Sequence, residues 1–338
     1  MNFIMTIDTE ADNQWDHGRG LTVENLRAVP RFQELCRRYG IKPTYLVTSE
    51  ICEDSFAREI FSDYIDSDEA EIGAHLHSWT TPPFLNREGF RYNDKNHAFA
   101  SELPEDLLAN KLRYLTDQIG TAFGRRPTSF RSGRYGFNEN VARALANNEY
   151  LVDSSVTPYI SWAAFKGVPG SGGGPDFMKK RPSPYNYTFG SKSLLEIPVT
   201  ILPTKFPLKR NDRLSDFYFS NVNNSFILRS FRSLFFRYQP VWLRPYPWMT
   251  YQQLEDLLKE AQYLNLPFMV MMFHSSELMP DCSIYRADSE AVEKLYELLE
   301  SFFVLLTYNS ITSVTLTEAA HKYNLLASKE ATLDFALK

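Results

Sequence analysis

Two pairs of residues with metal-binding side chains stand at the ends of apolar runs in this sequence. Asp8 and Glu10 follow "NFIMTI", and His75 and His77 close "EIGAHLH". Alternate residues of a β-strand point to the same side, so each pair can face a single site. Imidazoles and a carboxylate can hold a catalytic zinc and leave one position for water. The pattern favours a divalent metal, with one acid as ligand and the other as proton acceptor, in either order.

These residues could instead have a purely structural role, because acids after a strand also form turns and paired histidines can hydrogen-bond to each other. Two further segments weigh against it. His274 directly follows the apolar run "MVMMF", where it can act as a general acid. Arg131, within "SFRSGRYG", can orient a catalytic carboxylate or bind substrate. Asp153 in "YLVDSS" is a weaker candidate, since it can equally begin a turn.

The elements that must position these residues alternate along the chain. The hydrophobic patterns predict strands at 2–8, 43–48, 70–77, 129–136, 150–155, 193–200 and 267–274, and helices at 22–40, 105–123, 138–148, 250–264 and 288–306. Pro30 is expected to kink the first helix. Strands separated by helices favour parallel βα units, whose active sites lie at the C-terminal strand ends. All the candidate residues stand at such ends, which favours one shared site.

The domain organisation that we expect is a single barrel over residues 1–325. Its loop insertions lie near 80–104, 158–190 and 203–249, and a tail covers 326–338. No internal repeat is visible. A nucleotide-binding phosphate loop is also excluded, because "GSGGG" follows no strand pattern and precedes no Lys-Ser/Thr helix start.

The composition of the chain limits which classes of protein it can belong to. The chain has 338 residues, 43% of them hydrophobic, and a net charge of -5, which argues against a nucleic-acid binder. Three widely spaced cysteines suggest no disulfide framework. The start "MNFIMTIDTE" shows no signal-peptide pattern, and no apolar run approaches the roughly 18 residues of a spanning helix. We expect a cytoplasmic protein.

The order of the segments resembles the polysaccharide deacetylases, carbohydrate esterase family 4 with its NodB-homology domain, as a divergent cytoplasmic branch. The family's five motifs are matched by "TIDTE", "EIGAHLHSW", "SFRSGRYG", "YLVDSS" and "MMFHSS", over about residues 2–274. The resemblance implies a distorted (β/α) barrel of about seven parallel strands. It also implies metal-dependent removal of an N-acetyl or O-acetyl group from a sugar or glycan.

The resemblance also implies roles for individual residues. Asp8 would be the base and His274 the acid, with Arg131 holding Asp8. A divalent metal, expected to be zinc, would be held by Glu10, His75 and His77.

Two positions depart from the family pattern. Thr9 stands where the family has a second aspartate, and Trp79 where it has a second histidine, so His77 is the substitute ligand. The third motif keeps a tyrosine, Tyr135, but lacks the proline. Substrate contacts are expected from Tyr135, Asp153, Trp79 and Arg244.

Three alternatives stay open at this stage. Thr9 and Trp79 favour an inactive carbohydrate-binding barrel. The same barrel mouth could instead serve amidohydrolysis of a non-sugar amide or metal-dependent glycoside cleavage, with Asp8 and Asp153 as the two carboxylates that a glycosidase needs. Residues 223–248 mix aromatic and arginine side chains, so they form either a helix packed on the barrel or an interfacial helix on an anionic membrane. The second case would suit a lipid-linked saccharide precursor of the cell envelope as substrate, at the inner face of the membrane.

Overall fold

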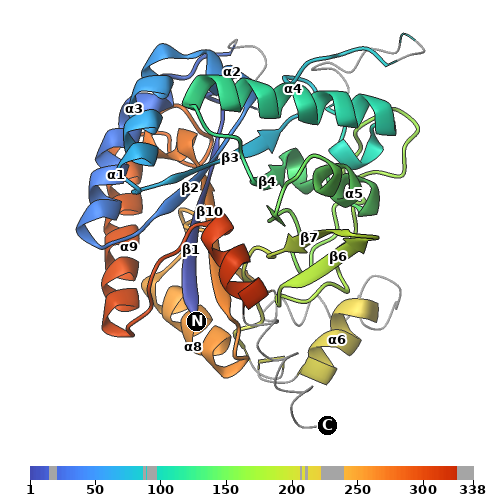
Figure 1. Cartoon of the computed structure of the whole chain (residues 1–338). Helices are drawn as coiled ribbons and strands as arrows, with labels where there is room; N and C mark the ends of the chain where they lie inside the picture. Colours follow the sequence, from blue (N-terminus) through green and yellow to red (C-terminus); the bar gives the residue numbers. More distant parts are fainter. Residues whose placement is uncertain are drawn as a thin grey trace.

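The computed structural model describes residues 1–14, 21–86, 89, 97–205, 208–209, 212–221 and 240–325. Its centre is an eight-stranded sheet in the order β10-β1-β2-β3-β4-β5-β7-β6 (Figure 1). The strands are β1 (Asn2–Thr9), β2 (Pro43–Val47), β3 (Glu71–Leu76), β4 (Ser129–Ser132), β5 (Val152–Asp153), β6 (Tyr185–Phe189), β7 (Lys192–Glu196) and β10 (Phe268–His274). Every neighbouring pair is parallel except β6 and β7, which form an antiparallel hairpin.

The sheet curls because the chain after β7 returns to β10 at the opposite edge. The Thr200 amide donates to the Val270 carbonyl at 3.1 Å, and the Val270 amide donates to the Thr200 hydroxyl at 2.8 Å. The short pair β8 (Ile201–Leu202) and β9 (Val241–Trp242) lies beside this junction. The predicted distorted barrel of about seven parallel strands is confirmed.

Helices surround the sheet (Figure 1). They are α1 (Val29–Arg38), α2 (Ser49–Glu53), α3 (Ser55–Asp66), α4 (Glu105–Phe123), α5 (Glu139–Asn147), α6 (Asp212–Asn221), α8 (Tyr251–Tyr263) and α9 (Ser289–Tyr308). The kink expected at Pro30 is wrong. Pro30 lies in the first turn of α1, after a 3₁₀ turn η1 (Glu24–Ala28), where its missing N–H leaves no hydrogen bond unmade.

The alternation of strand side chains explains where the reactive residues lie. Phe3, Met5 and Ile7 of β1 belong to the large core shared with the helices, and the Phe3 ring meets Phe302 of α9 at 5.6 Å. Ile4 belongs to a second core inside the curled sheet, and the helical residues 316–325 contribute to it. Asp8 comes four residues after Ile4, which is two repeats of the two-residue alternation along a strand. It therefore lies on the same face as Ile4 and points into the barrel above this inner core.

Some expected features were missed or fall outside the description. Helices α2 and α3 and hairpin strand β6 were not predicted, and the strand expected at 193–200 ends at Glu196. The helix expected within 223–248 lies mostly in 222–239, outside the described residues, as does the tail 326–338. None of the described helices combines the length and apolar character needed to cross a membrane.

Candidate active site

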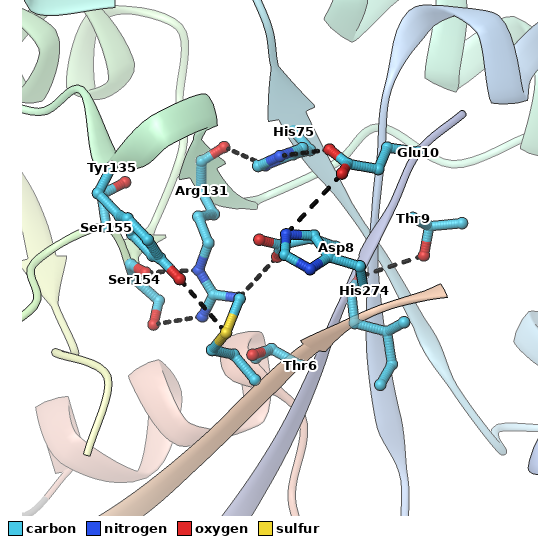
Figure 2. A network of polar contacts seen from close by, with 12 residues as sticks. Thr6, Asp8, Thr9, Glu10, His75, Arg131, Tyr135, Ser154, Ser155 and His274 are labelled. Carbon is cyan, nitrogen blue, oxygen red and sulfur yellow. Dashed lines mark hydrogen bonds and ion pairs between the residues drawn. The ribbon is translucent and has the colours of Figure 1, made fainter. Parts of the chain in front are cut away.

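Asp8 and Arg131 form a buried ion pair at the mouth of the barrel. Arg131 Nη1 donates to Asp8 Oδ1 at 2.7 Å, and both side chains are almost completely buried. The rest of the guanidinium is fixed by Ser154, whose carbonyl accepts from Nε at 2.7 Å and whose hydroxyl accepts from Nη2 at 3.1 Å. Figure 2 shows Arg131 lying between Asp8 and Ser154. Arg131 is therefore placed to orient one oxygen of Asp8, as expected.

The charge on Asp8 is stabilised by its neighbours. Burial alone would raise the pKa of this carboxyl, but the Arg131 guanidinium and the imidazoles of His75 and His274 outweigh it and lower the pKa. Asp8 is thus an ionised carboxylate, which is the state that a proton acceptor needs.

Glu10, His75 and His77 bring three ligand atoms together. Glu10 Oε2 lies 2.9 Å from His77 Nε2 and 3.5 Å from His75 Nε2, and the two ring nitrogens are 3.0 Å apart. Ligands about 2.0–2.2 Å from a tetrahedral zinc lie about 3.3 Å from one another. The three side chains, all buried, are therefore spaced as atoms that share one small cation.

The hydrogen bonds around this group fit a metal. His75 Nδ1 lies 2.9 Å from the Arg131 carbonyl oxygen, which only accepts, so Nδ1 carries the proton and Nε2 presents a lone pair to the cluster. Glu10 Oε2 is buried and faces the ring nitrogens of His77 and His75. Although burial raises the pKa of Glu10, His274 and the two histidines of the cluster outweigh it and lower the pKa. A carboxylate oxygen and two imidazole nitrogens at this spacing could hold a metal ion.

His274 faces the cluster from β10 and has a buried carboxylate behind it. Its Nε2 lies 3.8 Å from Glu10 Oε1, and its Nδ1 lies 3.3 Å from Glu277 Oε1. Arg244 Nη2 donates to the same Glu277 oxygen at 2.9 Å and lies 3.0 Å from His274 Nδ1. Burial raises the pKa of Glu277, but Arg244 and His274 outweigh it and lower the pKa. Glu277 is thus an ionised support for His274.

Glu277 was missed by the sequence argument, although a signal existed. It follows His274 by three residues, in the 3₁₀ turn η5 (Ser275–Leu278) that continues directly from β10. An acid at this spacing can accept hydrogen bonds from both the backbone amide and the ring of the histidine.

These residues open into a cavity of about 360 Å³. Its floor contains Asp8, Glu10, His75, His77 and His274, and its walls contain Phe99, Ser132, Arg134, Tyr135, Trp162, Phe165, Arg244 and Tyr285. The Tyr135 and Trp162 rings stack at 5.2 Å. Tyr135 and Arg244, two of the four expected substrate contacts, therefore lie where a substrate would meet them.

The other two expected substrate contacts do not line this cavity. Trp79 is buried behind the cluster, with its ring 4.4 Å from the His77 ring and 4.9 Å from that of His97. Asp153 is fully buried and accepts hydrogen bonds from the amide and hydroxyl of Ser155. Both positions are a correction to the sequence argument: Trp79 packs against a ligand, and Asp153 is part of the barrel interior.

Known proteins match this chain in structure only. No family model and no curated protein sequence matches. A provisionally named polysaccharide deacetylase from Mycobacterium smegmatis aligns over 96% of this chain and 91% of its own, with 11% identity and a TM-score of 0.54. A 4-alpha-glucanotransferase from Thermococcus litoralis aligns over 95% of this chain but 40% of its own, with 14% identity and a TM-score of 0.54. The PuuE allantoinase aligns over 96% and 89%, with 13% identity and a TM-score of 0.50.

The fold is therefore that of the polysaccharide deacetylases, and the resemblance is confirmed at this level. Because the same fold also occurs in proteins named for other reactions, it leaves the activity open. The reaction has to be argued from the residues in the cavity.

Proposed function

We propose that this chain is a metal-dependent hydrolase that removes an acetyl group from the amine of a sugar or glycan. The observation that carries the proposal is the Glu10–His75–His77 cluster beside the ionised carboxylate of Asp8. Zinc suits a set of two imidazoles and one carboxylate. When bound there, the metal supplies Lewis-acid chemistry, lowering the pKa of water and polarising a carbonyl group.

The side chains of the protein supply the proton transfers. Asp8 accepts a proton from the attacking water, and Arg131 keeps the reacting oxygen of Asp8 pointed into the cavity. As the oxygen of water bonds to the acetyl carbon, the C–N bond breaks and His274 gives a proton to the leaving nitrogen. The products are acetate and a free amine.

The walls of the cavity suit a sugar. Stacked aromatic rings offer flat apolar surfaces to the C–H faces of a pyranose, while Arg134 and Arg244 offer donors to its oxygens. A lipid-linked saccharide and O-acetyl esters remain expectations, since the segment 223–248 that suggested membrane contact lies largely outside the described residues.

Glycosidase chemistry is the less suitable alternative. It requires two carboxyl groups flanking the bond, one of them protonated. Asp8 and Glu10 both have lowered pKa values, and Asp153 is buried away from the cavity lining. An inactive binding module would not need an ionised base held by a buried arginine.

Acetate release tests the proposal. The chain is stripped of metal, reloaded with Zn²⁺, Co²⁺ or Mn²⁺, and incubated with N-acetylglucosamine oligomers. We expect acetate only from the reloaded protein. Equal acetate release by the metal-free chain would contradict metal dependence, and no release from any acetylated sugar would contradict the proposed reaction.

A further inference from the structure

The turn that follows β3 carries one of the proposed metal ligands and lies inside the protein. His77 comes directly after the last residue of β3, and its carbonyl accepts a hydrogen bond from the Thr81 amide at 3.0 Å. Most residues of 77–81 are buried, whereas turns generally lie at the surface. The backbone carbonyls of this turn are withdrawn from water, so they need hydrogen-bond donors inside the protein.

Lys111 supplies those donors from the buried face of α4. Its side chain is fully buried, and Nζ donates to the Ser78 carbonyl at 2.7 Å and also to the Thr81 carbonyl. The centroid of the Phe84 ring lies 5.1 Å from Nζ. Among the described residues, no carboxylate forms an ion pair with this amine. A lysine buried without an acid is costly unless its N–H groups are used, so Lys111 and the turn hold each other in one arrangement.

The ring of His77 has little room to move independently of this turn. It packs against Trp79, with 4.4 Å between the ring centroids. It also lies so close to Gly133 that a Cβ at that position would come within 3.0 Å of two ring carbons. A shift of the turn would therefore displace His77 Nε2 from its place 2.9 Å from Glu10 Oε2, because packing prevents the ring from rotating back.

The two histidines of the metal cluster are thus held by different means. His75 lies within β3, where it pairs in register with Arg131 of β4, and its Nδ1 lies 2.9 Å from the Arg131 carbonyl oxygen. His77 lies beyond the paired part of β3. Its backbone position depends on the turn that follows, and that turn is held by Lys111.

We propose that Lys111 is a positioning residue for the metal site. By binding the carbonyls of Ser78 and Thr81, it fixes the turn that places His77 beside Glu10. The inference rests on the metal site of the proposed function and extends it to a residue on a different element. Lys111 acts through the backbone of the turn, and it lines neither the metal cluster nor the cavity above it.

Zinc affinity, measured by competition with a chromophoric chelator, tests this role. Lys111→Met keeps the length of the side chain but removes its donors, and we expect zinc to bind about 10–100-fold more weakly, as when an outer-shell partner of a metal ligand is lost. The wild type and the variant are compared at one pH, with Tm recorded for each metal-free protein.

Thr116→Val is the matched control. Thr116 is a buried residue of the same helix, and its hydroxyl lies 2.7 Å from the Tyr150 hydroxyl, away from the turn. This variant also removes a buried hydrogen bond from α4, so it should lower Tm in a comparable way. It should leave the zinc affinity unchanged.

A second variant and a spectroscopic measurement guard against a merely structural effect. Lys111→Gln keeps an N–H donor on a shorter side chain, so its zinc affinity should lie between those of Lys111→Met and the wild type. The visible spectrum of bound Co²⁺ reports the geometry of the ligands. It should change in Lys111→Met and stay as in the wild type in Thr116→Val.

The possible outcomes separate this role from the proposed function. If Lys111→Met and Lys111→Gln bind zinc as tightly as the wild type, with the same Co²⁺ spectrum, Lys111 is not a positioning residue and the proposed function stands. If the wild type binds no zinc, the metal site fails, and the role of Lys111 fails with it. If zinc is bound but no acetylated sugar is hydrolysed, the proposed reaction fails, and the zinc affinities still decide the role of Lys111.

Discussion

Two pairs of buried carboxyl groups stand at strand ends of this barrel, and only one pair is equipped for chemistry. Asp8 and Glu10 leave β1 next to Arg131 and three histidines. Asp153 and Glu196 lie opposite each other in the register of β5 and β7, and both are fully buried. The two pairs are alike in burial and in their position at strand ends, but they have different neighbouring side chains.

The neighbours decide the protonation of each pair. Arg131, His75 and His274 lower the pKa of Asp8, and the three histidines lower the pKa of Glu10, despite burial. Burial raises the pKa of Asp153, and burial together with Asp153 raises the pKa of Glu196 well above its ordinary value. The Asp153–Glu196 pair, the inner pair, therefore keeps a proton and has a structural role. It accepts hydrogen bonds from Ser155 and from the Val156 amide. In this barrel, the pair that faces Arg131 and the three histidines is ionised, whereas the pair whose members face each other keeps a proton.

The sharpest test of this comparison exchanges the same atom in each pair. Asp8→Asn removes the proton acceptor, and we expect kcat to fall by about a thousandfold with the fold intact. Asp153→Asn should keep kcat within about threefold. Rates of acetate release, with circular dichroism on both variants, check this. Comparable losses in the two variants would mean that Asp8 has no special role.

Removing the carboxylate of Glu277, which supports His274, should lower kcat by less than Asp8→Asn does. In Glu277→Gln the ring loses its carboxylate partner while metal ligands stay untouched, so kcat should fall by about 10–100-fold with KM and zinc content little changed. The glutamine variant is preferred to an apolar one, because its amide oxygen can still accept a hydrogen bond from Arg244. A change in KM alone would point to substrate binding instead of proton transfer.

The inner pair should affect the pH dependence of the free energy of unfolding instead of the catalytic rate. The unfolded Glu196 ionises near pH 4.5, whereas the folded pKa is raised, so above that pH the folded chain binds more protons than the unfolded one. The free energy of unfolding should fall as pH rises from 5 to 8, by at most about 1.4 kcal/mol per unit. Glu196→Gln should flatten this slope in urea titrations. An unchanged slope would show that the pair holds no proton.

Lys111 should give a pH dependence of stability with the opposite sign. Its ammonium donates to the carbonyls of Ser78 and Thr81, in the turn after His77, and burial lowers its pKa to about 7 from an ordinary 10.5. Between these pH values the unfolded chain binds more protons, so stability contributed by this site should rise with pH. Lys111→Met should abolish the rise and cost about 1–2 kcal/mol at pH 7, because two buried carbonyls lose their donor. Melting curves at pH 7, 8 and 9 would show it.

Much of the fold and of the site follows from strand periodicity. The runs ending at Asp8, His77 and His274 each place a reactive side chain just where an apolar strand ends, so parallel βα order brings them together. What could not be predicted depends on long-range register. Asp153 resembles Asp8 in sequence, and only the alignment of β5 with β7 shows that it lies opposite a second buried acid, Glu196.

Short-range surroundings also escaped the sequence argument. The role of Glu277 depends on a 3₁₀ turn that follows β10 without a break, and the role of Lys111 depends on hydrogen bonds from α4 to the turn after His77. Trp79 was wrongly assigned to substrate binding. Its position in a motif suggested contact with the substrate, but its ring packs against the His77 ring.

Zinc content of matched Glu→Gln variants tests the central claim most directly. Wild type, Glu10→Gln and Glu196→Gln are purified in parallel, dialysed against limiting zinc and analysed by mass spectrometry of the metal. We expect about one zinc per chain in the wild type and in Glu196→Gln, and a large loss in Glu10→Gln. Equal zinc in all three proteins, or none in the wild type, would contradict a metal site built from Glu10, His75 and His77.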